Sequence, residues 1–151
     1  MKLKKGDAAP DFAGLDQDGK KIQLSDFKGK KLILYFYPKD NTPGCTSEAC
    51  DLRDNYEMWI SKGYRVVGVS PDNQKSHQKF IEKYDLPFPL IADEDKTIIK
   101  AYGAWGPKKL YGREYEGLLR TTFVIDENGK IEQVFTKVKT KDHTNQILET
   151  I

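Results

Sequence analysis

The sequence predicts an α/β fold built on a mixed central sheet with helices on both faces. Two apolar runs, at 31–38 and 64–70, are continuous rather than alternating, which is typical of strands buried on both faces of a sheet. A helical pattern follows each run, and strands that alternate with helices favour a parallel core. Turn signals near both ends of the chain add antiparallel hairpins to this core.

The first predicted elements are an N-terminal hairpin and a buried strand. Residues 11–16 and 21–24 flank the turn "QDGK", whose Asp-Gly pair is the signature of a tight hairpin. The run "KLILYFYP" follows at 31–38. Pro38 is expected to end this strand because proline cannot donate to the ladder of a central sheet.

A loop over 40–45 leads from this strand into a helix. From Thr46 to about residue 60, apolar residues recur every three or four positions, and Gly63 is placed to end the helix. The strand at 64–70 then completes a strand-loop-helix-strand unit. Because reactive groups gather where strands end and helices begin, we expect them in this loop and at the start of the helix.

The second half of the chain continues the pattern. It is expected to contain a helix over 71–85 with Asp72 as its N-cap, a short strand "FPLIAD", a short helix "KTIIKAYG", two strands "LLRTTFVID" and "KIEQVF" joined by "ENGK", and a closing helix "TKDHTNQILETI". The Gly- and Tyr-rich segment 103–117 is expected to be a surface loop. This order of elements is thioredoxin-like.

Length and composition indicate one globular domain, 1–151. A chain of 151 residues can bury a sufficient core without disulfides or metals. The 25 basic and 23 acidic residues give a net charge of +2, which is too balanced to indicate nucleic acid or a membrane surface as partner. The sequence shows neither a signal peptide nor a bilayer span, so the expected compartment is the cytoplasm.

Both cysteines lie in "DNTPGCTSEAC", residues 40–50, and four interpretations are open: a structural disulfide, a metal clip, a redox pair, or two buried thiols. A reducing compartment disfavours a permanent bridge. In an intact helix, Cys45 and Cys50 are about 140° apart around the axis and about 7.5 Å apart along it. A disulfide needs Cα atoms within about 7 Å, so these two can bond only if the first turns unwind.

Cys45 is the expected nucleophile because it lies at the start of the helix. Unpaired N–H groups and the helix dipole favour a thiolate there, by roughly 0.3–1 kcal/mol. A stronger effect needs a nearby cation, and the chain has four arginines, Arg53, Arg65, Arg113 and Arg120. Thr42 Oγ1 and nearby backbone N–H groups are candidate donors to a transition state. Gly44 lets a substrate approach the backbone closely.

Pro38, Thr42 and Cys45 form the pattern "PxxxTxxC", which resembles the active-site motif of peroxiredoxins. With Cys50 five residues later, the chain is similar to the bacterioferritin comigratory protein or peroxiredoxin Q subfamily. The segments "APDF", "LSDFKGKKLILYFYP", "VVGVSPD", "FPLIAD" and "RTTFVIDENGKI" occur in the family's order, so the resemblance covers essentially the whole chain. It implies an antioxidant thiol peroxidase with a thioredoxin fold and neither a metal nor an organic cofactor.

The resemblance also implies a role for each residue of the site. Cys45 would attack the terminal oxygen of hydrogen peroxide or an organic hydroperoxide and become a sulfenic acid. Thr42 would hydrogen-bond the peroxide, and Pro38 would shield the thiolate from water. Arg120 would stabilise the thiolate and polarise the O–O bond, with Glu48 orienting this arginine.

Cys50 matches the resolving cysteine of the subfamily. It would condense with the sulfenic acid to give an intramolecular disulfide, and thioredoxin or a similar dithiol protein would reduce that disulfide. Because both cysteines lie in one chain, the resemblance favours a monomer.

Simpler interpretations stay open for single residues. Cys50 alone fits a small buried hydrophobe, Thr42 fits an ST-turn, and Glu48 fits a first-turn residue favoured by the helix dipole. Arg53 is the alternative to Arg120 as the cation beside Cys45. It lies two turns along the helix that begins near Cys45 and is expected to pair with a surface carboxylate.

Other classes of protein also use a pair of cysteines. His77 and His143 are 66 positions apart, too far for a Cys₂His₂ zinc site. Either could be the base of a Cys-His hydrolase, but both are predicted to lie in polar helical segments away from the strand ends. A redox switch could use the same disulfide without catalysis. A disulfide oxidoreductase would use Cys-x-x-Cys, whereas four residues separate these cysteines.

Overall fold

The structure is a computed structural model that describes residues 3–151, with Leu110 described by its backbone alone. The elements in chain order are β1 (Ala13–Leu15), β2 (Lys21–Gln23), a 3₁₀ turn η1 (Leu24–Phe27), β3 (Lys31–Phe36), α1 (Pro43–Asp54), α2 (Tyr56–Ser61), β4 (Tyr64–Ser70), α3 (Gln74–Tyr84), β5 (Leu90–Ala92), α4 (Thr97–Ala101), β6 (Trp105–Leu110), β7 (Arg113–Leu118), β8 (Thr121–Ile125), β9 (Ile131–Phe135) and α5 (His143–Leu148).

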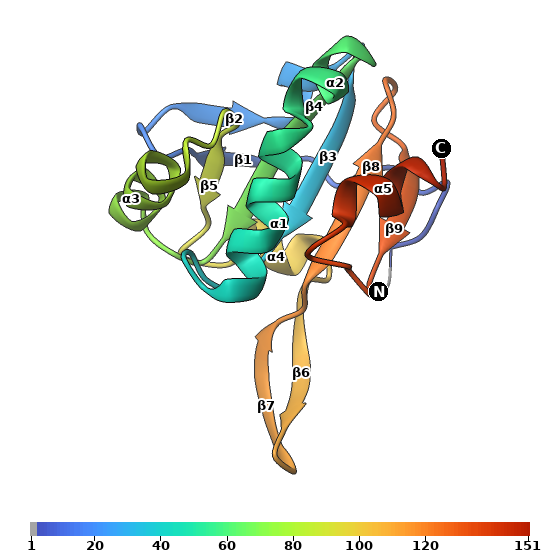
Figure 1. The fold of residues 1–151 in the computed structure, drawn as a ribbon. Helices are drawn as coiled ribbons and strands as arrows, with labels where there is room; N and C mark the ends of the chain where they lie inside the picture. Colours follow the sequence, from blue (N-terminus) through green and yellow to red (C-terminus); the bar gives the residue numbers. More distant parts are fainter. Residues whose placement is uncertain (1–2) are drawn as a thin grey trace.

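The central sheet has the strand order β5-β4-β3-β8-β9 (Figure 1). Strands β3, β4 and β5 run parallel, whereas β8 pairs antiparallel with β3 and β9 pairs antiparallel with β8. The prediction of a mixed sheet is therefore confirmed, as is that of the N-terminal hairpin, in which β1 pairs with β2.

Strand β3 separates two buried clusters because its side chains alternate between the faces of the sheet. Leu32, Leu34 and Phe36 belong to one cluster, and Ile33, Tyr35 and Tyr37 belong to the other. Burying each such side chain stabilises the fold by roughly 1.5–3 kcal/mol. The central position of β3 explains why its sequence is continuously apolar.

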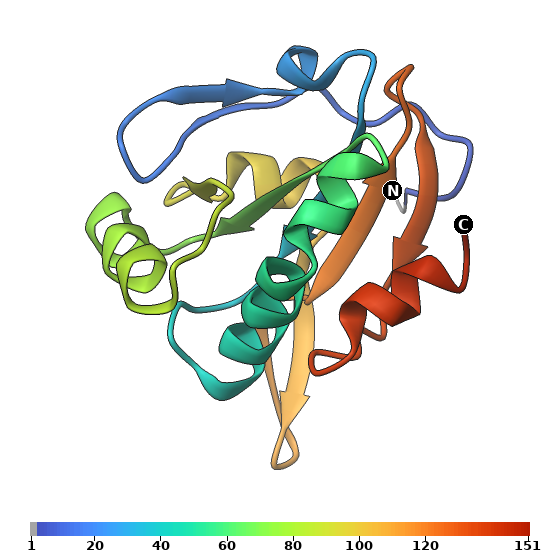
Figure 2. The same ribbon diagram turned by 45° about the horizontal axis from the view of Figure 1, so that its top comes forward.

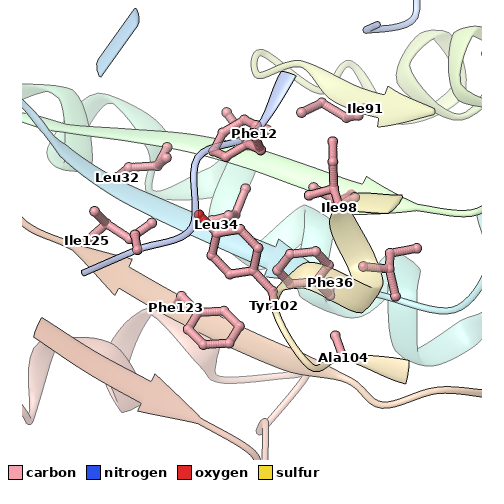
Figure 3. Packing of buried hydrophobic residues seen from close by; sticks show 14 of the residues in the cluster. Phe12, Leu32, Leu34, Phe36, Ile91, Ile98, Tyr102, Ala104, Phe123 and Ile125 are labelled. Carbon is pink, nitrogen blue, oxygen red and sulfur yellow. The ribbon is translucent and has the colours of Figure 1, made fainter. Parts of the chain in front are cut away.

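Helices cover both faces of the sheet, as predicted (Figure 2). Helix α4 and the β1–β2 hairpin cover the first face, where Phe12, Ile98 and Tyr102 pack against β3 (Figure 3). The second face carries α1, α2, α3 and α5, which contribute the buried side chains Leu52, Trp59, Phe80 and Ile147. Cys45 is part of this second cluster. No helix within residues 3–151 is long and apolar enough to cross a bilayer.

The prediction of a surface loop over 103–117 is wrong. Strands β6 and β7 pair with each other across a tight turn and extend away from the rest of the fold (Figure 1). Tyr111 at the turn is 95% exposed. The segment lacks the apolar alternation of a half-buried strand because most of its side chains meet solvent on both faces.

Two helix boundaries also differ from the prediction. The helix expected over 46–60 begins earlier, at Pro43, and is interrupted at Asn55. The Asn55 side chain donates to the carbonyl of Asp51 at 2.8 Å, which is the acceptor that its own backbone N–H would use in a continuous helix. Helix α3 is capped by Asn73, whose Oδ1 accepts the Ser76 N–H at 2.8 Å, rather than by Asp72.

Candidate active site

The site lies at the N-terminus of α1. Pro43 is the first helical residue and has no N–H group, so the N–H groups that the helix leaves unpaired begin with Gly44 and Cys45. Cys45 is free, lies in this first turn and is only 1% exposed. The start of the helix favours a negative charge on this sulfur, whereas burial among apolar side chains opposes it, so a cation beside the sulfur is needed.

Arg120 joins two of the predicted site residues. It lies in the short connection between β7 and β8, and its Nη2 donates to Cys45 Sγ at 3.1 Å. Its Nη1 donates to Glu48 Oε1 at 2.7 Å. Cys45 and Glu48 stand three residues apart on α1 and so present their side chains to one guanidinium. This two-branched contact uses the fixed fork of an arginine, which a lysine lacks.

Arg120 and Glu48 form a largely buried ion pair, and each affects the pKa of the other. Burial raises the pKa of Glu48 to about 7, although the Arg120 charge and hydrogen bond act in the opposite direction. Burial acts to lower the pKa of Arg120, but the charges of Glu48 and Cys45 outweigh it and raise that pKa. The guanidinium is therefore a permanent cation beside the sulfur.

Thr42, Gly44 and Pro38 border the same helix start. Thr42 is the N-cap residue, but its hydroxyl donates to the Lys39 carbonyl at 2.9 Å instead of capping the helix. Its oxygen lone pairs therefore face no donor of the helix. A Cβ at Gly44 would lie 3.3 Å from Arg120 Nη2, so the lack of a side chain leaves room for the guanidinium. Pro38 is half-buried just after β3.

Cys50 lies farther along α1 and is half-buried and free. Burial raises the pKa of its thiol; the Arg53 charge opposes this rise and the Asp54 charge adds to it. Arg53 forms a surface ion pair with Asp54 at 2.9 Å, as expected, and does not reach Cys45. Helix α1 is unbroken between the two cysteines, so the geometry that forbids a bond in an intact helix applies here.

The loop before α1 is fixed to α3. The Asp40 carboxylate accepts hydrogen bonds from Tyr37 Oη at 2.6 Å and from Ser76 Oγ at 2.7 Å, and it contacts His77 Nδ1 at 2.6 Å. His77 Nε2 lies 3.0 Å from the Ile91 carbonyl, which can only accept, so Nε2 carries a hydrogen. These contacts hold the loop independently of α1.

Both histidines lie in helices, as predicted, but they are fully buried beside the site and not away from it. His143 Nε2 lies 3.6 Å from Glu48 Oε2, directly behind the site. A signal was present in the sequence, because His77 precedes the buried Phe80 by three residues and His143 precedes the buried Ile147 by four, which places each on the apolar side of its helix.

Neither histidine is placed to act as a base toward Cys45. Within residues 3–151, the side-chain hydrogen bond to Cys45 Sγ comes from Arg120, and both imidazoles bond elsewhere. The described residues also contain no group of three or more His, Cys, Asp and Glu side chains that could hold a metal ion. A thiol beside an arginine at a helix start, on a thioredoxin-like sheet, defines a thiol-dependent redox protein.

Comparison with known proteins narrows this class. The model of the AhpC/TSA family matches residues 5–134. Peroxiredoxin Bcp of Bacillus subtilis (strain 168) is 46% identical over 151 residues, covering 100% of this chain and 96% of its own length. The chain therefore belongs to the AhpC/TSA family, among the Bcp or Q peroxiredoxins, and it is a thiol peroxidase that takes a peroxide and a thiol reductant.

Solved structures agree with this assignment. A Cys-to-Ser variant of Xylella fastidiosa PrxQ superposes with a TM-score of 0.92 at 31% identity, covering 99% of this chain and 95% of that chain. Xanthomonas campestris bacterioferritin comigratory protein, in a structure of its trapped intermediate or ligand complex, has a TM-score of 0.86 at 33% identity, covering 91% of this chain and 88% of that chain. The thioredoxin-like fold is thereby confirmed.

Proposed function

We propose that Cys45 is the peroxidatic thiol and Cys50 the resolving thiol of an intramolecular disulfide cycle. The observation that carries this proposal is the contact of Arg120 Nη2 with Cys45 Sγ at 3.1 Å, at a helix start whose N–H groups are unpaired. A permanent cation at this distance stabilises the thiolate, which is the reactive form of cysteine. The same cation is available to the negative charge that develops on the peroxide.

In the first step, the Cys45 thiolate attacks the terminal oxygen of a hydroperoxide. An S–O bond forms, the O–O bond breaks, and the departing oxygen takes a proton from solvent to leave as water or an alcohol. Thr42 Oγ1 accepts a hydrogen bond from the terminal O–H, since its own hydrogen is used by Lys39. Arg120 donates to the oxygen that gains charge. Pro38 limits the access of water.

In the second step, the Cys50 sulfur attacks the sulfenic sulfur, water leaves, and a disulfide forms. This step requires residues 45–50 to unwind, because the two positions are about 7.5 Å apart along an intact helix. Glu48 lies within the unwound segment, so its bond to Arg120 is broken at the same time. The arginine site is therefore assembled only in the reduced, helical state.

The remaining parts of the proposal concern reductant, substrate and assembly. We assign thioredoxin or a similar dithiol protein as reductant, because two successive thiol exchanges return both cysteines to thiols. The protein works as a monomer in a reducing compartment such as the cytosol. The X. campestris relative is described by its alkyl peroxide reduction activity, which supports organic hydroperoxides as substrates beside hydrogen peroxide.

A peroxide-consumption assay coupled to thioredoxin and its reductase tests the proposal. The wild-type protein is expected to turn over, and Cys45→Ser is expected to be inactive. Cys50→Ser is expected to react once and then to stop with thioredoxin. Wild-type activity in Cys45→Ser would refute the peroxidatic assignment, and sustained turnover of Cys50→Ser with thioredoxin would refute the resolving one.

A further inference from the structure

The residues behind Arg120 form a second, fully buried contact that the proposed cycle does not use. Glu48 places Oε1 on Arg120, while its other oxygen, Oε2, is buried and has no hydrogen-bond partner. That oxygen faces His143 Nε2 at 3.6 Å. His143 belongs to α5, so this contact links the C-terminal helix to the helix that carries both cysteines.

The orientation and tautomer of His143 follow from its other neighbours. Gln146 Oε1 accepts the Lys139 N–H at 2.9 Å, and Gln146 Nε2 donates to the Lys137 carbonyl at 2.8 Å, which fixes the amide. His143 Nδ1 lies 2.9 Å from this same Oε1 and must donate to it. In the neutral imidazole, Nε2 is therefore an acceptor with a single lone pair, which is open either to the Thr122 hydroxyl at 2.9 Å or to a proton on Glu48 Oε2.

Two sets of lone pairs would then meet between Glu48 and His143. An ionised carboxylate and an unprotonated Nε2 repel each other at 3.6 Å, whereas one proton on either group makes the contact attractive. Burial raises the pKa of Glu48 to about 7 and lowers that of His143, so each group resists a charge of its own. The charged or titratable groups around the pair are Arg120, Cys45, Asp51 and Tyr35.

We propose that His143 is a positioning residue of the peroxidase reaction, which shares one proton with Glu48 Oε2 and so keeps Glu48 Oε1 on Arg120 and Arg120 on Cys45. This inference rests on the proposed roles of Cys45, Arg120 and Glu48. The shared proton also balances charge: with a Cys45 thiolate and the Arg120 cation, the four groups are neutral when the proton is present and carry −1 when it is absent.

The same contact makes α5 a support for the reactive end of α1. Asp51 Oδ2, one turn after Glu48, accepts the Thr144 N–H at 2.6 Å. Helix α5 thus holds α1 at two successive turns, through His143 and through Thr144. When residues 45–50 unwind for disulfide formation, the His143 contact is lost together with the Arg120 contact.

A double-mutant cycle separates a positioning role from a merely structural one. The measured quantity is the second-order rate constant of the Cys45 reaction with hydrogen peroxide, in a Cys50→Ser background that isolates the first step. His143→Leu is expected to lower this rate constant by about tenfold, in line with the loss of a buried hydrogen bond to a charged group. In a Glu48→Ala protein, which has no side chain for His143 to position, the same substitution is expected to change it by less than twofold. Equal factors in both backgrounds, or no effect in either, would overturn the proposal.

A wild-type measurement covers the case in which His143→Leu does not fold. The chain has only two histidines, so ¹H–¹⁵N correlation of their rings gives two resolvable patterns. His143 is expected to carry its hydrogen on Nδ1, whereas His77 carries one on Nε2. A neutral His143 with its hydrogen on Nε2 would contradict the inference. Full activity in Cys45→Ser would instead refute the proposed function, so the two failures are distinguishable.

Discussion

Arg120 is the residue on which the site chemistry depends most directly. Its two guanidinium branches contact a thiol and a carboxylate that stand one turn apart on α1, at 3.1 Å and 2.7 Å. A contact through both branches of the guanidinium fixes the direction of its N–H donors and holds its positive charge beside the sulfur. The residue types were predictable from sequence, whereas the 75-residue separation between Cys45 and Arg120 is closed only by the fold.

Arg120→Lys should lower kcat/KM for hydrogen peroxide by about 100-fold, because an ammonium cannot reach both Cys45 and Glu48 with fixed geometry. The matched control is Arg53→Lys, on α1, whose partners are the exposed Asp54 and the Tyr84 carbonyl. Steady-state assays with both variants check this prediction. A fall of less than threefold for Arg120→Lys would contradict it.

Gly44→Ala should separate activity from stability. The new Cβ would lie 3.3 Å from Arg120 Nη2 and push the guanidinium away from the sulfur, so the reaction rate should fall by about tenfold. Alanine is the better helix former, so the melting temperature should stay the same or rise. Stopped-flow kinetics and thermal unfolding of one sample measure both quantities, and an unchanged rate would argue against the close fit.

At the scale of elements, helix α1 has to be both the support of the reactive site and the segment that opens. Its start is anchored from outside the helix, since Asp40 is held by Tyr37, Ser76 and His77. Arg120 and His143 hold its second turn through Glu48. Unwinding of residues 45–50 therefore breaks the contacts of Glu48 but leaves the contacts of Asp40, before the helix, in place.

Substitutions at Ser47 should set the rate of disulfide formation. Ser47 is a half-buried residue between the two cysteines, and glycine costs a helix about 1 kcal/mol relative to alanine. If unwinding precedes bond formation, Ser47→Gly should form the disulfide about fivefold faster than Ser47→Ala after one pulse of peroxide. Quenched-flow samples analysed by mass spectrometry test this prediction. Equal rates in the two variants would mean that helix unwinding does not limit disulfide formation.

Several elements were predictable because their signal is local. The strand at 64–70 agrees with β4 at both ends, and the Asp-Gly and Asn-Gly turns lie in hairpins. The β6–β7 hairpin was not predictable from apolar periodicity, because its side chains are mostly exposed. The break at Asn55 depends on one side-chain hydrogen bond to Asp51, which no periodicity records.

At the scale of the whole molecule, the site is assembled from segments that are distant in sequence. Helix α1, the connection before β8 and the C-terminal helix meet on the second face of the sheet. The burial of His143 is a tertiary property: the spacing to Ile147 indicates its side of the helix, but the segment is rich in polar residues, and packing against α1 is what buries the imidazole. This explains why the motif residues were predictable while the residue behind them was not.

Glu48 makes folding stability depend on pH in a predictable direction. Its pKa is about 7 in the folded protein and near 4.5 when unperturbed, so between these values the native state holds a proton that the unfolded state has lost. This contribution to stability is complete below pH 4.5 and is lost as pH rises toward 7. Burial lowers the pKa of His143, so its contribution to stability changes with pH in the opposite direction. Wild type and Glu48→Gln both contain His143.

Urea unfolding of wild type and Glu48→Gln between pH 4.5 and 7.5 isolates this contribution. The free energy of unfolding of wild type should fall relative to that of the variant, on the order of 1 kcal/mol per pH unit within the window. A constant difference across the window would mean that Glu48 is ionised throughout.

The central claim is that Cys45 is oxidised first and that Cys50 then closes the bond by unwinding α1. Intact mass spectrometry after one equivalent of hydrogen peroxide tests it most directly. The wild-type protein should lose two hydrogen atoms, and Cys50→Ser should gain one oxygen atom located on Cys45. Loss of two hydrogens in Cys50→Ser, or an oxygen atom located on Cys50 in Cys45→Ser at the same rate, would contradict the claim.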